Sequence, residues 1–131
     1  MKAAIVPIAA LFALSLSATG IAAEAPRSYE GVRSMWEKDR DSLEYREYAA
    51  EFVQYANYYH IDKKGGCYSL SPGPVELMLI ITKPDDDKFA QVERVLSDVD
   101  NEKSRCFQRS FEGLRTRVPP YTPFVLQMQM K

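Results

Sequence analysis

The clearest hydrophobic pattern in this chain is a stripe of aromatic residues in its first half. Aromatic side chains recur there at intervals of three and four residues, which predicts a helix from about Asp41 to His60 with one aromatic face. The stripe consists of Tyr45, Tyr48, Phe52, Tyr55 and Tyr59. Asp41 and Glu44 have the spacing of a capping box, and two glycines follow the helix as a stop. The stripe is interpreted as the core-facing side of the helix, with a groove for a small ligand as the alternative.

The segment before this helix, Pro26–Asp39, has a weaker pattern. Tyr29, Val32 and Trp36 fall at helical spacing, but Gly31 lowers the helix propensity between them. The sequence therefore leaves open whether this segment is a helix.

After Cys67 the hydrophobic period changes from helical to alternating. Val75–Thr82 reads as a strand with apolar residues on both faces, which predicts a central position in a sheet. An acidic turn at residues 84–87 leads into a second predicted strand, Phe89–Ser97. Alternation fails there between Val95 and Leu96, which indicates a bulge or the end of the strand. Phe124–Met130 alternates again and predicts a last strand with one core face and one polar face.

A second helix is predicted between these last two strands, over Cys106–Arg117. Its apolar stripe steps by four, three and four residues, and residues 98–101 offer caps for its start. The stripe consists of Phe107, Phe111, Leu114 and Val118. The proline-rich run Val118–Pro123 cannot continue a helix and turns the chain into its last strand.

These elements predict an α+β domain. Two amphipathic helices can together cover one face of a three-stranded antiparallel sheet, which gives a two-layer architecture. The sequence predicts a single such domain over residues 24–131.

The first residues have the pattern of a signal peptide. A charged start at Lys2 precedes an almost wholly apolar or small run, Ala3–Ala23, that ends in small residues. The best cleavage point follows Ala23, which makes residues 1–23 the signal peptide and predicts export to the periplasm. The alternative is an uncleaved anchor in the inner membrane, because the run is nearly long enough to span a bilayer.

Export gives the two cysteines a context. Cys67 and Cys106 are the only cysteines in the chain, and an even count in an oxidising compartment predicts a disulfide. The pair lies 39 positions apart, unlike the closely spaced pairs of exchange enzymes. A structural staple is therefore the preferred interpretation over a redox pair.

Charge and motifs exclude several classes of function. The formal net charge of −1 lacks the basic excess of a nucleic-acid-binding protein. The sequence contains no phosphate-binding glycine loop, nucleophile elbow or zinc motif. His60 is the only histidine and has no ligand partners at metal spacing, and the acidic turn lacks the spacing of a calcium loop. We expect no enzymatic activity, no metal and no cofactor.

One resemblance to a known family is present. Residues 74–131 resemble the C-terminal domain of the TonB family through Val75–Ile81, Val92–Ser97, the helix Cys106–Arg117 and the run Val118–Pro120 before Phe124–Leu126. When the segment from Cys67 is included, the TonB-like part of the domain spans residues 67–131. The chain departs from the family in lacking a spacer rich in proline and lysine, and in having a longer aromatic helix and the cysteine pair.

The resemblance implies a recognition module that binds a peptide segment by adding it to a sheet edge. The last strand is then the candidate edge, with Phe124, Gln127 and Gln129 as its contact residues and Arg105 and Arg109 as polar neighbours. The alternative is that this edge is only protected from aggregation.

We therefore expect a non-enzymatic periplasmic adaptor whose partner is another protein of the periplasm or envelope. An alternative of a different class is a small exported inhibitor or immunity protein that neutralises a toxin or hydrolase. We expect no nucleic-acid partner and, after cleavage of the signal peptide, no stable membrane span.

Overall fold

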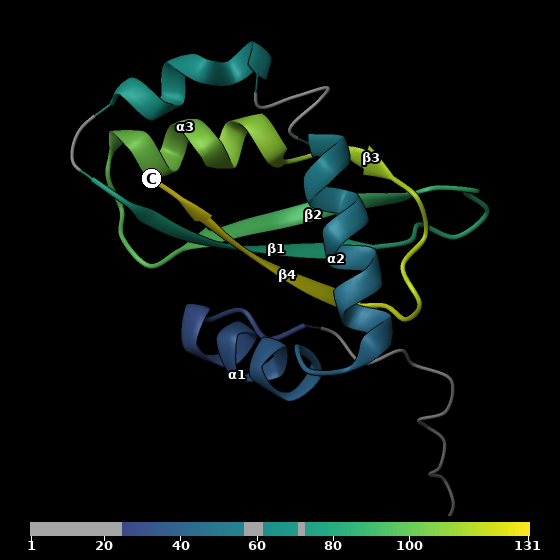
Figure 1. Ribbon diagram of the computed structural model, residues 1–131. Helices are drawn as coiled ribbons and strands as arrows, with labels where there is room; N and C mark the ends of the chain where they lie inside the picture. Colours follow the sequence, from purple (N-terminus) through teal and green to yellow (C-terminus); the bar gives the residue numbers. More distant parts are fainter. Residues whose placement is uncertain (1–24, 57–61, 71–72) are drawn as a thin grey trace, which may run out of the picture.

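The computed structural model describes residues 25–56, 62–70 and 73–131 (Figure 1). The predicted signal peptide lies outside these residues, as do Tyr59 and His60. No helix in the described part of the chain is both long and apolar enough to cross a membrane.

The described residues form an α+β domain, as predicted. The elements in chain order are α1 (Tyr29–Asp39), α2 (Leu43–Ala56), the 3-10 helix η2 (Asp62–Ser69), β1 (Val75–Thr82), β2 (Ala90–Ser97), α3 (Glu102–Phe111), β3 (Arg115–Thr116) and β4 (Phe124–Met130). The strands make one antiparallel sheet in the order β3-β2-β1-β4. The prediction of three strands is therefore wrong by one short strand, β3, whereas the hairpin, the central β1 and the final strand are confirmed.

The extra strand arises because α3 ends earlier than predicted. Asn101 caps its start by accepting a hydrogen bond from the Ser104 N–H at 2.8 Å, but the helix stops at Phe111 rather than at Arg117. Gly113 adopts a φ of +82°, which favours glycine and turns the chain out of the helix. The Gly113 N–H then donates to the Val92 carbonyl at 2.8 Å. Local backbone geometry at this glycine thus converts the predicted last helical turn into the approach to β3.

The predicted irregularity in the second strand lies elsewhere. Ile80 pairs with Arg94 and Ile81 pairs with Val92, so the register shifts at Glu93 rather than between Val95 and Leu96. This bulge brings Val92 and Val95 to the same buried face although they are three residues apart.

Both faces of the sheet are covered, so the predicted two-layer arrangement is wrong. α2 and α3 pack on one face, with η2 packed against α3, and α1 lies on the other face (Figure 1). On the α1 side, Val32 packs with Met78, Ile80 and Val125. The second face of β4 is therefore partly apolar, because Val125 contributes to this smaller cluster. The ambiguous first segment is a helix capped by the side chain of Ser28.

α1 is fastened to the sheet by Glu76 of β1. The Tyr29 hydroxyl donates to this carboxylate, and Arg33 Nε pairs with it at 3.1 Å. Gln129 Nε2 of β4 donates to its other oxygen at 3.0 Å. Burial alone would raise the pKa of Glu76, but the hydrogen bonds from Tyr29 and Arg33 outweigh it and lower that pKa. Glu76 is therefore held as a carboxylate at the junction of α1, β1 and β4.

Candidate functional site

The aromatic stripe of α2 divides into a buried part and an exposed end. Tyr45 and Tyr48 are buried and enclose Phe124 of β4, with ring centroids 5.0 Å and 4.7 Å away. Phe52 is also buried, whereas Tyr55 is 40% exposed. Most of the stripe is therefore core, and its C-terminal end reaches the surface.

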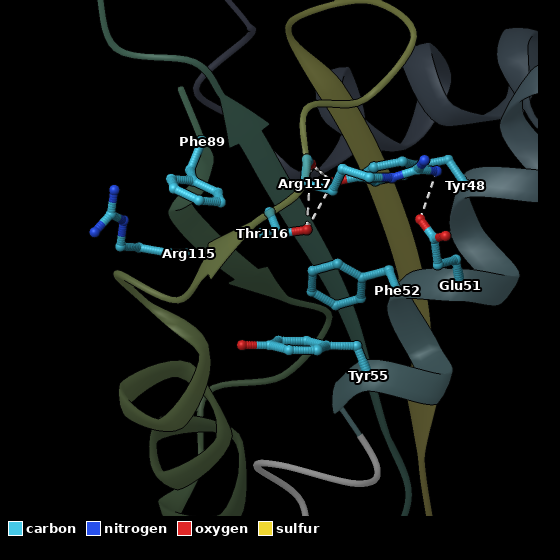
Figure 2. Close-up of a pocket in the computed structure, with 8 residues that line it drawn as sticks. All are labelled: Tyr48, Glu51, Phe52, Tyr55, Phe89, Arg115, Thr116 and Arg117. Atoms are coloured by element: carbon cyan, nitrogen blue, oxygen red, sulfur yellow. Dashed lines mark hydrogen bonds and ion pairs between the residues drawn. The ribbon is translucent and has the colours of Figure 1, made fainter. Parts of the chain in front are cut away.

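That exposed end lines a groove between α2 and β3, here called the α2–β3 groove (Figure 2). Its volume is about 350 Å³. The lining residues are Tyr48, Glu51, Phe52, Tyr55, Phe89, Arg115, Thr116 and Arg117. An apolar hollow of this size with a few polar groups at its rim has the character of a binding pocket.

Tyr48 fixes the position of β3 beneath α2. Its hydroxyl donates to the Arg117 carbonyl at 2.7 Å and lies 2.9 Å from Thr116 Oγ1. Burial raises the pKa of this hydroxyl, so it remains a protonated donor at neutral pH. The helix and the edge strand that form the two sides of the groove are thus joined by one side chain.

Two ion pairs stand at the rim of the groove. Arg117 Nη2 lies 2.5 Å from Glu51 of α2, and Arg115 Nη2 lies 3.2 Å from Asp87. The Arg115 guanidinium also lies 4.8 Å from the ring centroid of Phe89, which is 49% exposed. The backbone N–H of Phe89 and then the nearby Arg115 lower the pKa of Asp87. These contacts hold a charged rim around an aromatic interior.

β4, the predicted binding strand, lies at one end of the sheet, but residues of α2 and β1 already contact it. The Gln127 backbone N–H donates to the Tyr45 hydroxyl at 3.3 Å, so α2 covers the edge at that point. Gln129 is tied to Glu76, and Phe124 is fully buried. Of the three predicted contact residues on this strand, Phe124 belongs to the core, and both glutamines already have partners within the domain.

The two predicted arginines lie on α3, which packs against β2, η2 and β1. Arg105 is exposed and pairs with Asp100 at 2.7 Å, and Arg109 is exposed as well. They therefore do not form one site with the buried Phe124.

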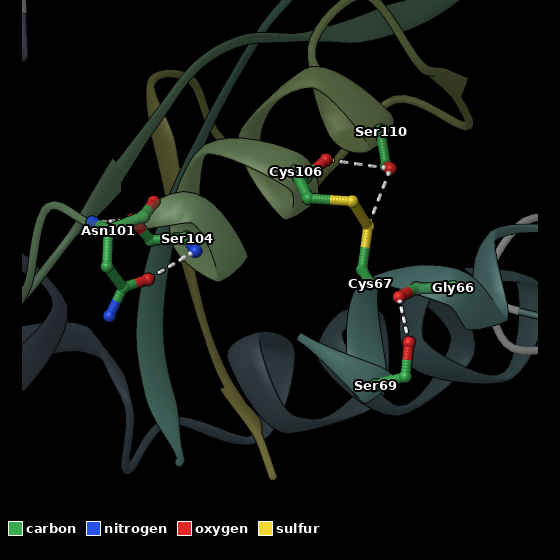
Figure 3. Close-up of a disulfide and its surroundings, with 7 residues drawn as sticks. All are labelled: Gly66, Cys67, Ser69, Asn101, Ser104, Cys106 and Ser110. Carbon is green, nitrogen blue, oxygen red and sulfur yellow. Dashed lines mark hydrogen bonds between the residues drawn. A yellow bond between two sulfur atoms is a disulfide. The ribbon is translucent and has the colours of Figure 1, made fainter. Parts of the chain in front are cut away.

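The predicted disulfide joins Cys67 of η2 to Cys106 of α3 (Figure 3). Cys67 is buried, and its sulfur lies 3.7 Å from the hydroxyl oxygen of Ser110. This setting in the packed interface of two helices suits a structural bond, because an exchange cysteine needs access for a thiolate.

Most residues of the groove lie outside the predicted aromatic stripe. Phe89 was expected among the apolar members of a strand, but it precedes β2 and points into the groove (Figure 2). Arg115 and Thr116 were assigned to a helix, so the edge strand beside the groove could not be anticipated. The aromatic stripe was the available signal, because Tyr48, Phe52 and Tyr55 all line the groove.

No three residues among the described His, Cys, Asp and Glu side chains are grouped so that they could hold a metal ion. Comparisons with protein families, with curated proteins and with solved structures find no match to this chain.

Proposed function

We propose that the protein is a non-enzymatic binding module of the periplasm that takes a large apolar side chain of a partner protein into the α2–β3 groove. The observation that carries the proposal is the combination of aromatic walls, exposed arginines and an edge strand at one place. Tyrosine, phenylalanine and arginine are enriched at protein interfaces, and hot spots lie where such residues form pockets.

The resemblance to the TonB C-terminal domain supports an adaptor role. It implies a hairpin, a helix and a final strand, and the chain has this order in β1, β2, α3 and β4. It also implies binding by addition of a strand to a sheet edge. α2 contacts both edge strands, because the Tyr45 hydroxyl accepts from the Gln127 N–H on β4 and the Tyr48 hydroxyl donates to the Arg117 carbonyl next to β3. The α2–β3 groove is therefore the feature that favours β3 as the proposed binding edge.

The experiment that tests this proposal is affinity capture from periplasmic extract with matched surface variants. Phe89→Ala removes the most exposed aromatic wall of the groove, whereas Leu43→Ala removes another apolar side chain, 62% exposed, that does not line it. Truncating a hot-spot residue costs about 2 kcal/mol, or about thirtyfold in affinity. We expect the unmodified protein and Leu43→Ala to recover the same partner and Phe89→Ala to lose it.

The identity of the captured protein separates the two classes of function. An envelope receptor or structural protein supports the adaptor, and a toxin or hydrolase supports an inhibitor that uses the same groove. Capture that is unchanged by Phe89→Ala, with all three proteins equally folded by circular dichroism, would contradict the proposed site.

A further inference from the structure

The chemistry of β3 narrows the class of partner, provided that the α2–β3 groove is the binding site proposed above. We infer that the partner segment is an extended strand that pairs with β3 and carries acidic side chains on either side of one large apolar side chain. The inference rests on the position of β3 in the sheet, on its two arginines and on the groove beside it.

β3 occupies one end of the strand order, so β2 pairs with only one of its two sides. Directly after β3, the Arg117 carbonyl accepts from the Tyr48 hydroxyl, so an added segment would pair with the backbone of β3 before that residue. An edge strand presents backbone donors and acceptors to an added segment. Alternate side chains of an added strand point to opposite faces, so every second side chain would face α2 and the groove. A peptide paired with β3 can therefore place one apolar side chain between Tyr55 and Phe89 (Figure 2).

Arg115 and Arg117 favour acidic residues on both sides of that apolar side chain in the partner segment. The side chains of Arg115 and Arg117 are 63% and 70% exposed. Within the described residues, each meets its acid through Nη2, which leaves other donors of a five-donor guanidinium for a second carboxylate. The cross-strand neighbour of Arg115 on β2 is Gln91, which brings no negative charge. Acidic residues on an added strand would supply the opposite charge that stabilises cross-strand pairs.

The same charges argue against a second copy of this chain at β3. Two copies paired antiparallel about Thr116 would set Arg115 of one opposite Arg117 of the other, and like charges directly opposite are destabilising. A basic segment would add positive charge beside the two guanidiniums and compete with them for Asp87 and Glu51. An acidic partner is therefore favoured over both self-association and a basic partner.

Selection of a random linear-peptide phage library on the immobilised protein tests the inference. The expected consensus is a large apolar residue with Asp or Glu one or two positions away on each side. A synthetic consensus peptide should bind at least tenfold more weakly when its acids are changed to glutamine. The double variant Arg115→Gln, Arg117→Gln should lose a similar factor for the acidic peptide, and Arg109→Gln, an exposed arginine on α3, should lose none.

The outcomes separate this inference from the function on which it rests. A consensus that is apolar but lacks acids, with binding abolished by Phe89→Ala, would overturn the acidic specificity and leave the groove as the site. A basic consensus would overturn it as well. No enriched peptide sensitive to Phe89→Ala would overturn both the specificity and the proposed groove function.

Discussion

Replacing Cys67 and Cys106 together by alanine should lower the free energy of unfolding by about 4 kcal/mol. The bond closes a loop of 39 positions between η2 and α3, and removing it restores that loop entropy to the unfolded chain. Domains of this kind have total stabilities of about 5–15 kcal/mol, so the loss is a large fraction of the whole. The bond is thus expected to be a main source of stability.

Denaturant unfolding of the oxidised protein, the double variant and each single variant measures this effect. The single variants should be about as unstable as the double variant, because either one removes the cross-link. A mass shift on thiol labelling should appear in the single variants and be absent from the native protein. A double variant that unfolds at nearly the same denaturant concentration as the native protein would show that the cross-link is dispensable for stability.

Phe124→Ala should lower the free energy of unfolding by about 3–5 kcal/mol without a specific effect on partner binding. Phe124 is fully buried and lies against Tyr45, Tyr48 and Tyr121, so its truncation leaves a cavity at the contact between α2 and β4. The resemblance to the TonB C-terminal domain implied Phe124 as a binding contact. Its place in the structure makes it a core residue.

Phe89→Ala is the matched comparison for this prediction. Phe89 is half exposed, so its removal should lower the free energy of unfolding by only about 1 kcal/mol while partner capture falls. Unfolding curves and capture assays on the two variants should therefore give opposite patterns. Equal destabilisation by both variants, or loss of capture only in folded Phe124→Ala protein, would contradict this division of core and site.

Hydrophobic periodicity was sufficient to predict α2, the hairpin of β1 and β2, and β4. These elements bury long, regular stripes, and the apolar second face of β1 also indicated its central place. Periodicity failed where single residues decide the backbone. Gly113, with its positive φ, ends α3. The bulge at Glu93 changes the face of the sheet to which the Val92 side chain points. Neither event changes the apolar spacing enough to be read from the sequence.

The groove was harder to predict because it depends on tertiary contacts between distant segments. Tyr48 reaches Arg117 across 69 positions, and that contact sets β3 beside α2. Phe89 lies outside the strand to which its pattern assigned it, so its exposure could not be foreseen. Sequence patterns indicated an aromatic helix, and the resemblance to the TonB C-terminal domain indicated β4 as a binding edge, but no pattern indicated that β3 would form.

Site-specific photo-crosslinking tests the central claim that the α2–β3 groove, and not β4, binds the partner. The photoreactive residue p-benzoylphenylalanine is incorporated at Tyr55 in one protein and at Gln129, an exposed residue of β4, in another. After irradiation with periplasmic extract, the Tyr55 position should form a covalent product with the captured partner and the Gln129 position should not. A product from Gln129 alone would contradict the groove and restore β4 as the binding edge.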